Sequence, residues 1–141
     1  MKIKFGCQKG TAAIEAALVL SFVLVPLLLG VIDASLFIYN SQVIANASRE
    51  GARLGIKMES LDESAINTLR ERIIAYCRDL GLINWGGPTD PEIVIDVPVS
   101  PITYEDSIAV TVTFNYSPLF LSIFNSTLTL SETTFMKMEG L

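Results

Sequence analysis

The chain has 141 residues, a net charge of −5 and no histidine, and half of its residues are hydrophobic. An acidic chain without clustered Lys or Arg argues against nucleic acid as a partner, because phosphate binding needs such clusters. No Gly-rich phosphate loop or cluster of metal ligands is present, so we expect no enzyme activity and no cofactor. So apolar a composition indicates that part of the chain is hidden in lipid or in an assembly.

The N-terminal part predicts a membrane-spanning helix. The run from Ala16 to Ile32 carries no charge, and Lys2, Lys4 and Lys9 precede it. At ~1.5 Å per residue a helix over this run spans roughly 25 Å, close to the thickness of bilayer hydrocarbon. The positive-inside rule then keeps the N-terminus in the cytoplasm and exports the rest of the chain.

Two common alternatives explain this segment less well. A cleavable signal peptide needs a small-x-small site directly after the apolar run, but the best triplet, Ala45-Asn46-Ala47, lies well beyond it. A plain signal anchor explains the lysines and the apolar run but not Glu15, which lies at the edge of that run. A carboxylate costs about 2.5–3.5 kcal/mol at the centre of a membrane helix and less near its end, and a simple anchor gains nothing from it.

The segment Lys9-Gly10-Thr11-Ala12-Ala13-Ile14-Glu15 resembles the class III signal of type IV pilins and pseudopilins. In those proteins a prepilin peptidase cuts a basic leader after Gly, and the fifth residue of the mature chain is Glu. Cleavage after Gly10 would make Thr11 the new N-terminus and Glu15 the fifth residue, whereas cleavage after Gly6 would place Thr11 fifth. The resemblance implies that Glu15 acts in assembly, by neutralising the terminal amine of a neighbouring subunit.

Beyond the membrane we expect the same helix to continue with one buried stripe. The stripe consists of Val43, Ile44, Ala47, Gly51 and Leu54. The residues that can face water are Asn40, Gln42, Asn46, Arg49, Glu50 and Arg53.

The Arg49-Glu50-Gly51-Ala52-Arg53 stretch at this distance from the apolar run resembles the TadE-like family, the minor pilins or pseudopilins of the tight-adherence (Flp) pilus machinery. The resemblance allows Arg49, Glu50 and Arg53 a role in partner contact, with an acidic surface suiting the two arginines. Local ion pairs on a solvated helix face are the simpler interpretation. Ala16 follows Glu15 where major Flp pilins carry an aromatic residue, and the body is longer than theirs, so a minor pilin is favoured.

A second helix is predicted by a capping box at Ser60-Leu61-Asp62-Glu63 and a C-terminal stop at Gly81. Its apolar stripe consists of Leu61, Ala65, Ile66, Leu69, Ile73, Cys77 and Leu80. We expect Cys77 to be a small buried hydrophobe. The following loop, 82–91, contains Trp85, which we expect to cover the edge of the core or to meet a membrane surface.

The C-terminal part predicts strands. Alternation is clearest from Ser107 to Tyr116, is present from Ile93 to Val99, and extends from Thr127 to Met138 with an expected irregularity near Glu132. The apolar patch from Leu119 to Phe124 suits a strand, a helical turn or a contact surface. The expected fold is α+β, with an antiparallel sheet of three strands packed on the helices.

These observations predict a basic leader over 1–10, a transmembrane and assembly helix over 11–39, and an exported α+β domain over 40–141. The resemblance implies a single-pass inner-membrane protein that acts structurally in pilus biogenesis. Its implied partners are prepilin peptidase, other pilins and minor pilins, the inner-membrane assembly platform and membrane lipid. A type II secretion pseudopilin would share the leader but lack the Arg-Glu-Gly-Ala-Arg stretch, and an unrelated single-pass anchor carrying a binding domain would keep its leader uncleaved.

Overall fold

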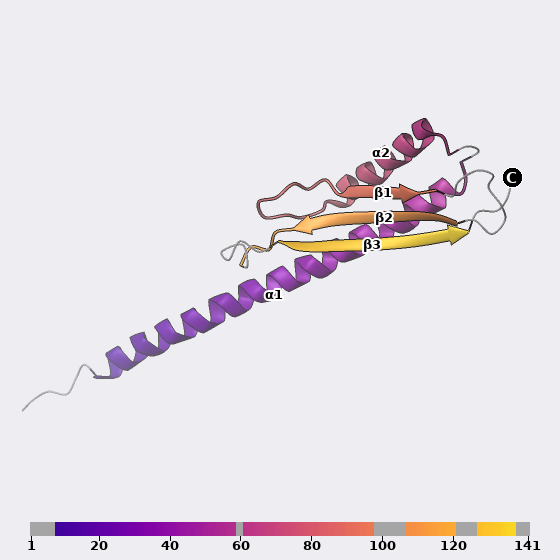
Figure 1. The fold of residues 1–141 in the computed structure, drawn as a ribbon. Coiled ribbons are helices and arrows are strands. Elements are labelled where there is room, and N and C mark those ends of the chain that lie inside the picture. The colour runs from indigo at the N-terminus through magenta and orange to yellow at the C-terminus, as the bar shows by residue number, and fades with distance from the viewer. Residues whose placement is uncertain (1–7, 59–60, 98–106, 121–126, 138–141) are drawn as a thin grey trace, which may run out of the picture.

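The computed structural model describes residues 8–58, 61–97, 107–120 and 127–137 (Figure 1). The long helix α1 (Gln8–Gly55) leads into α2 (Glu63–Leu80), and strands β1 (Glu92–Asp96), β2 (Ser107–Tyr116) and β3 (Leu128–Lys137) follow. The strands form one antiparallel sheet in the order β1-β2-β3. The predicted α+β class and three-stranded antiparallel sheet are therefore confirmed.

The helix α1 has two halves with different surroundings. Its N-terminal half extends away from the other elements, and the C-terminal half lies against the sheet and α2 (Figure 1). The buried stripe of the second half has helical spacing and consists of Asp33, Asn40, Val43, Ile44, Ala47, Ser48, Gly51, Ala52 and Gly55. The helix continues on both sides of Pro26 and across the boundary predicted after residue 39.

The sheet packs its apolar face on the helices. The alternating residues of β2 on that face are all buried, namely Ile108, Val110, Val112, Phe114 and Tyr116. They form the core with the α1 stripe and with Leu69, Ile73 and Cys77 of α2. The opposite face of the sheet is mostly polar, with hydroxyl pairs at Thr111–Thr133 and Thr113–Ser131. This is the hydrophobic-in, polar-out pattern expected of an antiparallel sheet with one solvated face.

Three sequence expectations need correction. Asn40 does not face water: its side chain is fully buried and hydrogen-bonded. The helix α2 begins at Glu63 with Asp62 as its N-cap, because Asp62 has an extended backbone (φ −66°, ψ 161°). The pairing of β2 with β3 continues through Val112↔Glu132 without a shift in register, so β3 has no irregularity there.

Other expectations are confirmed or lie outside the described residues. Gly81 ends α2 in the left-handed conformation (φ 70°), and Cys77 is buried. Leu80, at the end of the predicted stripe, is 39% exposed. Ser60, Val99 and most of the 119–124 patch lie outside the described residues.

Candidate membrane and assembly surface

The N-terminal half of α1 exposes apolar side chains on every side. Every residue from Gly10 to Val25 is exposed, including Phe22 at 84%. A surface of this size is incompatible with a chain that stays alone in water. By length and composition, α1 is long enough and apolar enough to cross a membrane. This helix fits a single-pass membrane anchor, with the sheet and α2 on one side of the bilayer.

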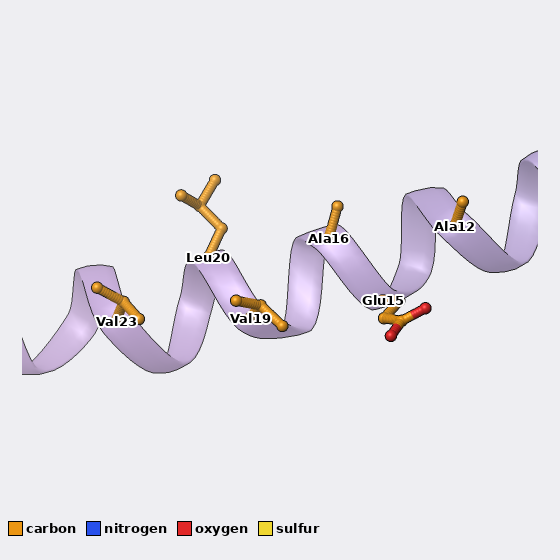
Figure 2. Close-up of a pocket in the computed structure, with 6 residues that line it drawn as sticks. All are labelled: Ala12, Glu15, Ala16, Val19, Leu20 and Val23. Carbon is orange, nitrogen blue, oxygen red and sulfur yellow. The ribbon is translucent and has the colours of Figure 1, made fainter.

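Glu15 lies on this apolar surface near its N-terminal end. Figure 2 shows its carboxylate beside the helix, in one row with Val19 and Val23 at i, i+4 spacing. Ala12, Ala16 and Leu20 form the adjacent row, and the two alanines leave a shallow hollow that Glu15 borders. Gly10 and Thr11 lie one turn before Glu15 and are also exposed. The predicted cleavage and assembly residues thus occupy the same end of the free helix.

Asp33 marks the point where α1 enters the folded domain. Its carboxylate accepts hydrogen bonds from the backbone N–H groups of Leu119 at 2.8 Å and Phe120 at 2.7 Å. The hydroxyl of Tyr116 lies 3.4 Å from the same carboxylate, and the Asp33 side chain is buried. Burial, followed by the neighbouring negative charge, raises the pKa of Tyr116 to about 12. A buried carboxylate is stable in such a place because several donors satisfy it.

Asn40 makes a second connection, two turns further along α1. Its amide N–H donates to the carbonyl of Ile83 at 2.8 Å, and its oxygen accepts from the Ile83 N–H at 3.1 Å. The hydroxyl of Tyr39 donates to the carbonyl of Leu80 in the same region. These bonds attach the loop after α2 to α1. Within the described residues, no buried side-chain polar atom lacks a partner.

Asn84 connects the loop after α2 with the turn after β2, both of which are hydrogen-bonded to α1. Its amide N–H group donates to the carbonyls of Pro88 and Asn115, and its oxygen accepts from the Ser117 N–H at 2.8 Å. The backbone N–H of Trp85 also donates to the carbonyl of Ser117. The loop after α2 and the turn after β2 therefore form one hydrogen-bonded unit.

The Arg-Glu-Gly-Ala-Arg stretch divides between core and surface. Gly51 and Ala52 are buried, while Arg49 and Arg53 are exposed and Glu50 is half-buried. Arg53 forms an ion pair with Glu50 at 3.0 Å, as the local interpretation of this stretch predicts. A Cβ at Gly51 would lie 2.5 Å from Cδ1 of Ile73 and 3.2 Å from Cγ1 of Val110, so glycine is needed for the close approach of α1 to α2 and β2. Arg49 is left pointing to solvent and makes no ion pair with the described residues.

Sequence reasoning missed Asp33, Asn40 and Asn84 as structural residues. A pattern that could have indicated the first two is the heptad spacing of Asp33, Asn40 and Ala47, which places both polar residues on the buried stripe. Nothing in the described part of the chain groups three His, Cys, Asp or Glu residues as a metal site would require. The arrangement is that of a long apolar helix joined by buried hydrogen bonds to a small domain.

The family model described as TadE-like protein matches residues 10–53. No curated protein and no solved structure matches the chain. The matched segment begins at Gly10 and ends at Arg53, so it contains the Arg-Glu-Gly-Ala-Arg stretch and, except for Lys9, the stretch that ends at Glu15. The TadE-like family is a structural family associated with the tight-adherence pilus, and the resemblance predicted from the sequence is confirmed over this segment.

Proposed function

We propose that this protein is a minor pilin, or pseudopilin, of a tight-adherence pilus machinery and that it acts structurally in pilus biogenesis. Prepilin peptidase removes residues 1–10 on the cytoplasmic face of the inner membrane. Thr11 becomes the N-terminus of a chain that stays in the membrane through α1, with the α+β domain exported. Other pilins and the inner-membrane assembly platform then contact the exposed half of α1.

The position of Glu15 is the observation that carries this proposal. Its carboxylate borders an apolar helix surface, one turn after the proposed cut, on a segment matched by the TadE-like family model. A charge there is unfavourable in lipid unless it has a partner. The α-amine that cleavage creates at Thr11 of a neighbouring subunit is a partner of opposite charge at the same depth. Pairing the two offsets the cost of burying each.

The first test is the mass and N-terminal sequence of the protein purified from its native membrane. We expect a membrane-bound chain that begins at Thr11. The Gly10→Asp variant should keep its leader, whereas Gly6→Ala, which alters the other leader glycine, should be cut normally. A chain that begins at Met1 in cells with active prepilin peptidase would reject the pilin proposal and leave a signal anchor. A start beyond Ile32 would reject the membrane anchor as well.

Assembly is tested separately with Glu15→Gln, which removes the charge and keeps the size and most of the polarity of the side chain. We expect normal cleavage but loss of crosslinking to neighbouring pilins through α1. The Ser21→Ala variant is the matched control, because Ser21 is polar, exposed and on the same free helix. Normal crosslinking by Glu15→Gln would show that the carboxylate has no part in assembly.

A further inference from the structure

The end of the domain nearest the free half of α1 is built from two loops. Figure 1 shows that the α2–β1 connection and the C-terminal end of β2 both lie at this end. Hydrogen bonds fix them at defined heights along α1. Phe120 is bonded at the level of Asp33, and Ile83 at the level of Asn40. The backbone N–H of Trp85 donates to the carbonyl of Ser117, so Trp85 belongs to the same bonded unit.

The positions of these hydrogen bonds along α1 can be compared with the thickness of a bilayer. A hydrocarbon core of ~30 Å takes about 20 helical residues, so a core that begins near Ala16 ends near Ser35. The headgroup region adds several ångströms beyond this point. The stretch from Asp33 to Asn40 rises roughly 10 Å and thus crosses from the outer edge of the hydrocarbon through the headgroups. Both loops lie within this layer.

The loops carry apolar side chains where they would meet that layer. We call the exposed residues Ile38, Ile83, Trp85 and Leu128 the apolar rim; they are 60%, 38%, 48% and 38% exposed. An apolar pocket of about 380 Å³ lies between α1 and the turn after β2, lined by Gly30, Ala34, Phe37, Pro118, Phe120 and Leu128 together with Asp33 and Tyr116. Tryptophan with aliphatic neighbours is the composition found at the headgroup level of membrane proteins.

Most of the charges around the rim are paired. The loop is uncharged from Gly81 to Thr89, and Arg78 and Asp90 on its two sides form an ion pair at 3.0 Å. The carboxylate of Asp33 is already bonded to two backbone N–H groups. Asp79 is exposed and forms no ion pair with the described residues, so it is the charge at this end of the domain that must keep its contact with water.

We propose that the apolar rim rests in the headgroup layer of the membrane that α1 crosses, so that the exported domain sits on the bilayer. This inference rests on the membrane anchoring in the proposed function and adds to it a lipid-binding surface centred on Trp85. Continuity with the exposed apolar surface of α1 is what favours lipid over a second copy of the chain. The rim would also fix the angle between α1 and the bilayer, since the domain and the second half of α1 are one packed unit.

Trp85 is the only tryptophan, so its fluorescence tests the inference directly. The full chain is reconstituted in vesicles of phosphatidylcholine and phosphatidylglycerol, with a fraction of the lipid brominated near the top of the acyl chain. We expect a blue-shifted emission that brominated lipid quenches strongly and aqueous iodide quenches weakly. The control is a double variant, Trp85→Phe with Phe135→Trp, which moves the probe to a 70%-exposed position at the far end of β3. Its emission should be quenched by iodide and not by brominated lipid.

The outcomes separate the lipid surface from the anchor. Quenching of Trp85 by iodide alone, in protein that floats with the vesicles, would overturn the rim proposal while leaving the anchored minor pilin intact. Shielding from both quenchers would overturn it in favour of contact between copies. Protein that fails to float would overturn both the rim and the membrane anchor, whereas leader cleavage is measured independently by mass.

Discussion

The carboxylate of Asp33 accepts a hydrogen bond from the backbone N–H of Phe120 at 2.7 Å, although the two residues are far apart in the chain. The contact joins the last part of the free helix to the turn after β2. Because the N–H of Leu119 donates to the same carboxylate, two backbone N–H groups of the turn after β2 are satisfied by one side chain of α1. The free helix and the sheet are therefore held in a fixed relation at the point where α1 enters the folded domain.

Replacing Asp33 should destabilise the domain. In Asp33→Asn one of the two backbone N–H groups faces the NH2 group of the amide, which cannot accept a hydrogen bond. In Asp33→Ala both N–H groups lose their acceptor. Leaving a buried donor unsatisfied costs about 1–3 kcal/mol, so both variants should unfold at lower urea concentration, with alanine the worse. Pulse proteolysis of the detergent-solubilised full chain measures the shift.

The matched control is Asp96→Asn, which removes the same charge from an exposed position on β1. Exposed substitutions of this kind usually change the free energy of unfolding by less than about 0.5 kcal/mol. If Asp33→Asn behaved like this control, the bonds from Asp33 would not hold the turn in place.

Short-range sequence periodicity predicted the elements whose buried face can be recognised from the spacing of their own apolar residues. The alternation from Ser107 to Tyr116 gave the bounds and the buried face of β2, because period two is visible within the strand itself. The buried stripe at Val43, Ile44 and Ala47 was likewise visible from helical spacing, and its members are buried. In both cases the information lies within one element.

Asp33 and Asn40 could not be assigned in this way, because their partners are backbone groups that only the tertiary fold brings near. A polar side chain on a helix is expected to face water unless a distant segment supplies donors and acceptors. Asp62 is a related case, since Leu61 packs against the core and the extended backbone of Asp62 follows it before the helix begins. The roles of Gly10, Thr11, Glu15 and Arg49 depend on other proteins, and they stay predictions.

Gly51 should resist replacement where Gly30 does not. A Cβ at Gly51 meets Ile73 and Val110, and overpacking of a core costs about 1–3 kcal/mol. The gain in helix propensity from Gly to Ala is about 1 kcal/mol, so Gly51→Ala should be destabilised by up to about 2 kcal/mol and Gly51→Leu by more. Maleimide labelling of Cys77 as a function of urea concentration, in a Cys7→Ser background, measures the unfolding midpoint of both variants.

Gly30→Ala is the control, because no atom lies within 4 Å of a Cβ built at Gly30. Both glycines lie inside α1, so each variant replaces a helical glycine by alanine. Equal unfolding midpoints for Gly51→Ala and Gly30→Ala would show that close packing does not explain the glycine of the Arg-Glu-Gly-Ala-Arg stretch.

The domain should lose stability in alkaline solution, starting with Cys77. Burial raises the pKa of its thiol from 9.0 to about 11, so between these values the unfolded chain releases a proton that the folded chain keeps. The stabilisation from the neutral thiol is complete below about pH 9 and is lost as the pH rises to about 11. Tyr116 continues the trend, since its pKa is raised from 10.0 to about 12.

Pulse proteolysis at a series of pH values tests this titration. Cys77→Ala lowers the unfolding midpoint at neutral pH through its small cavity, but should show a flatter decline between pH 9 and 11 than the parent chain. Parallel curves for the parent and Cys77→Ala would mean that the thiol does not titrate with unfolding.

Arg49 should matter for assembly and not for stability. It is exposed, makes no ion pair with the described residues, and lies directly before Glu50 and one turn before Arg53. Arg49→Glu should therefore unfold at the same urea midpoint as the parent chain. It should lose crosslinks to acidic partner subunits, because the new carboxylate repels the acidic surface that Arg49 attracts. Arg70→Glu is the matched control, since Arg70 is an exposed arginine on α2 that donates a hydrogen bond to the neutral Asn67. Equal loss of crosslinks in both variants would show that net charge alone is responsible. Retention of crosslinks in both would show that Arg49 contacts no partner and that the Arg-Glu-Gly-Ala-Arg stretch serves the fold of this chain through Gly51 and Ala52.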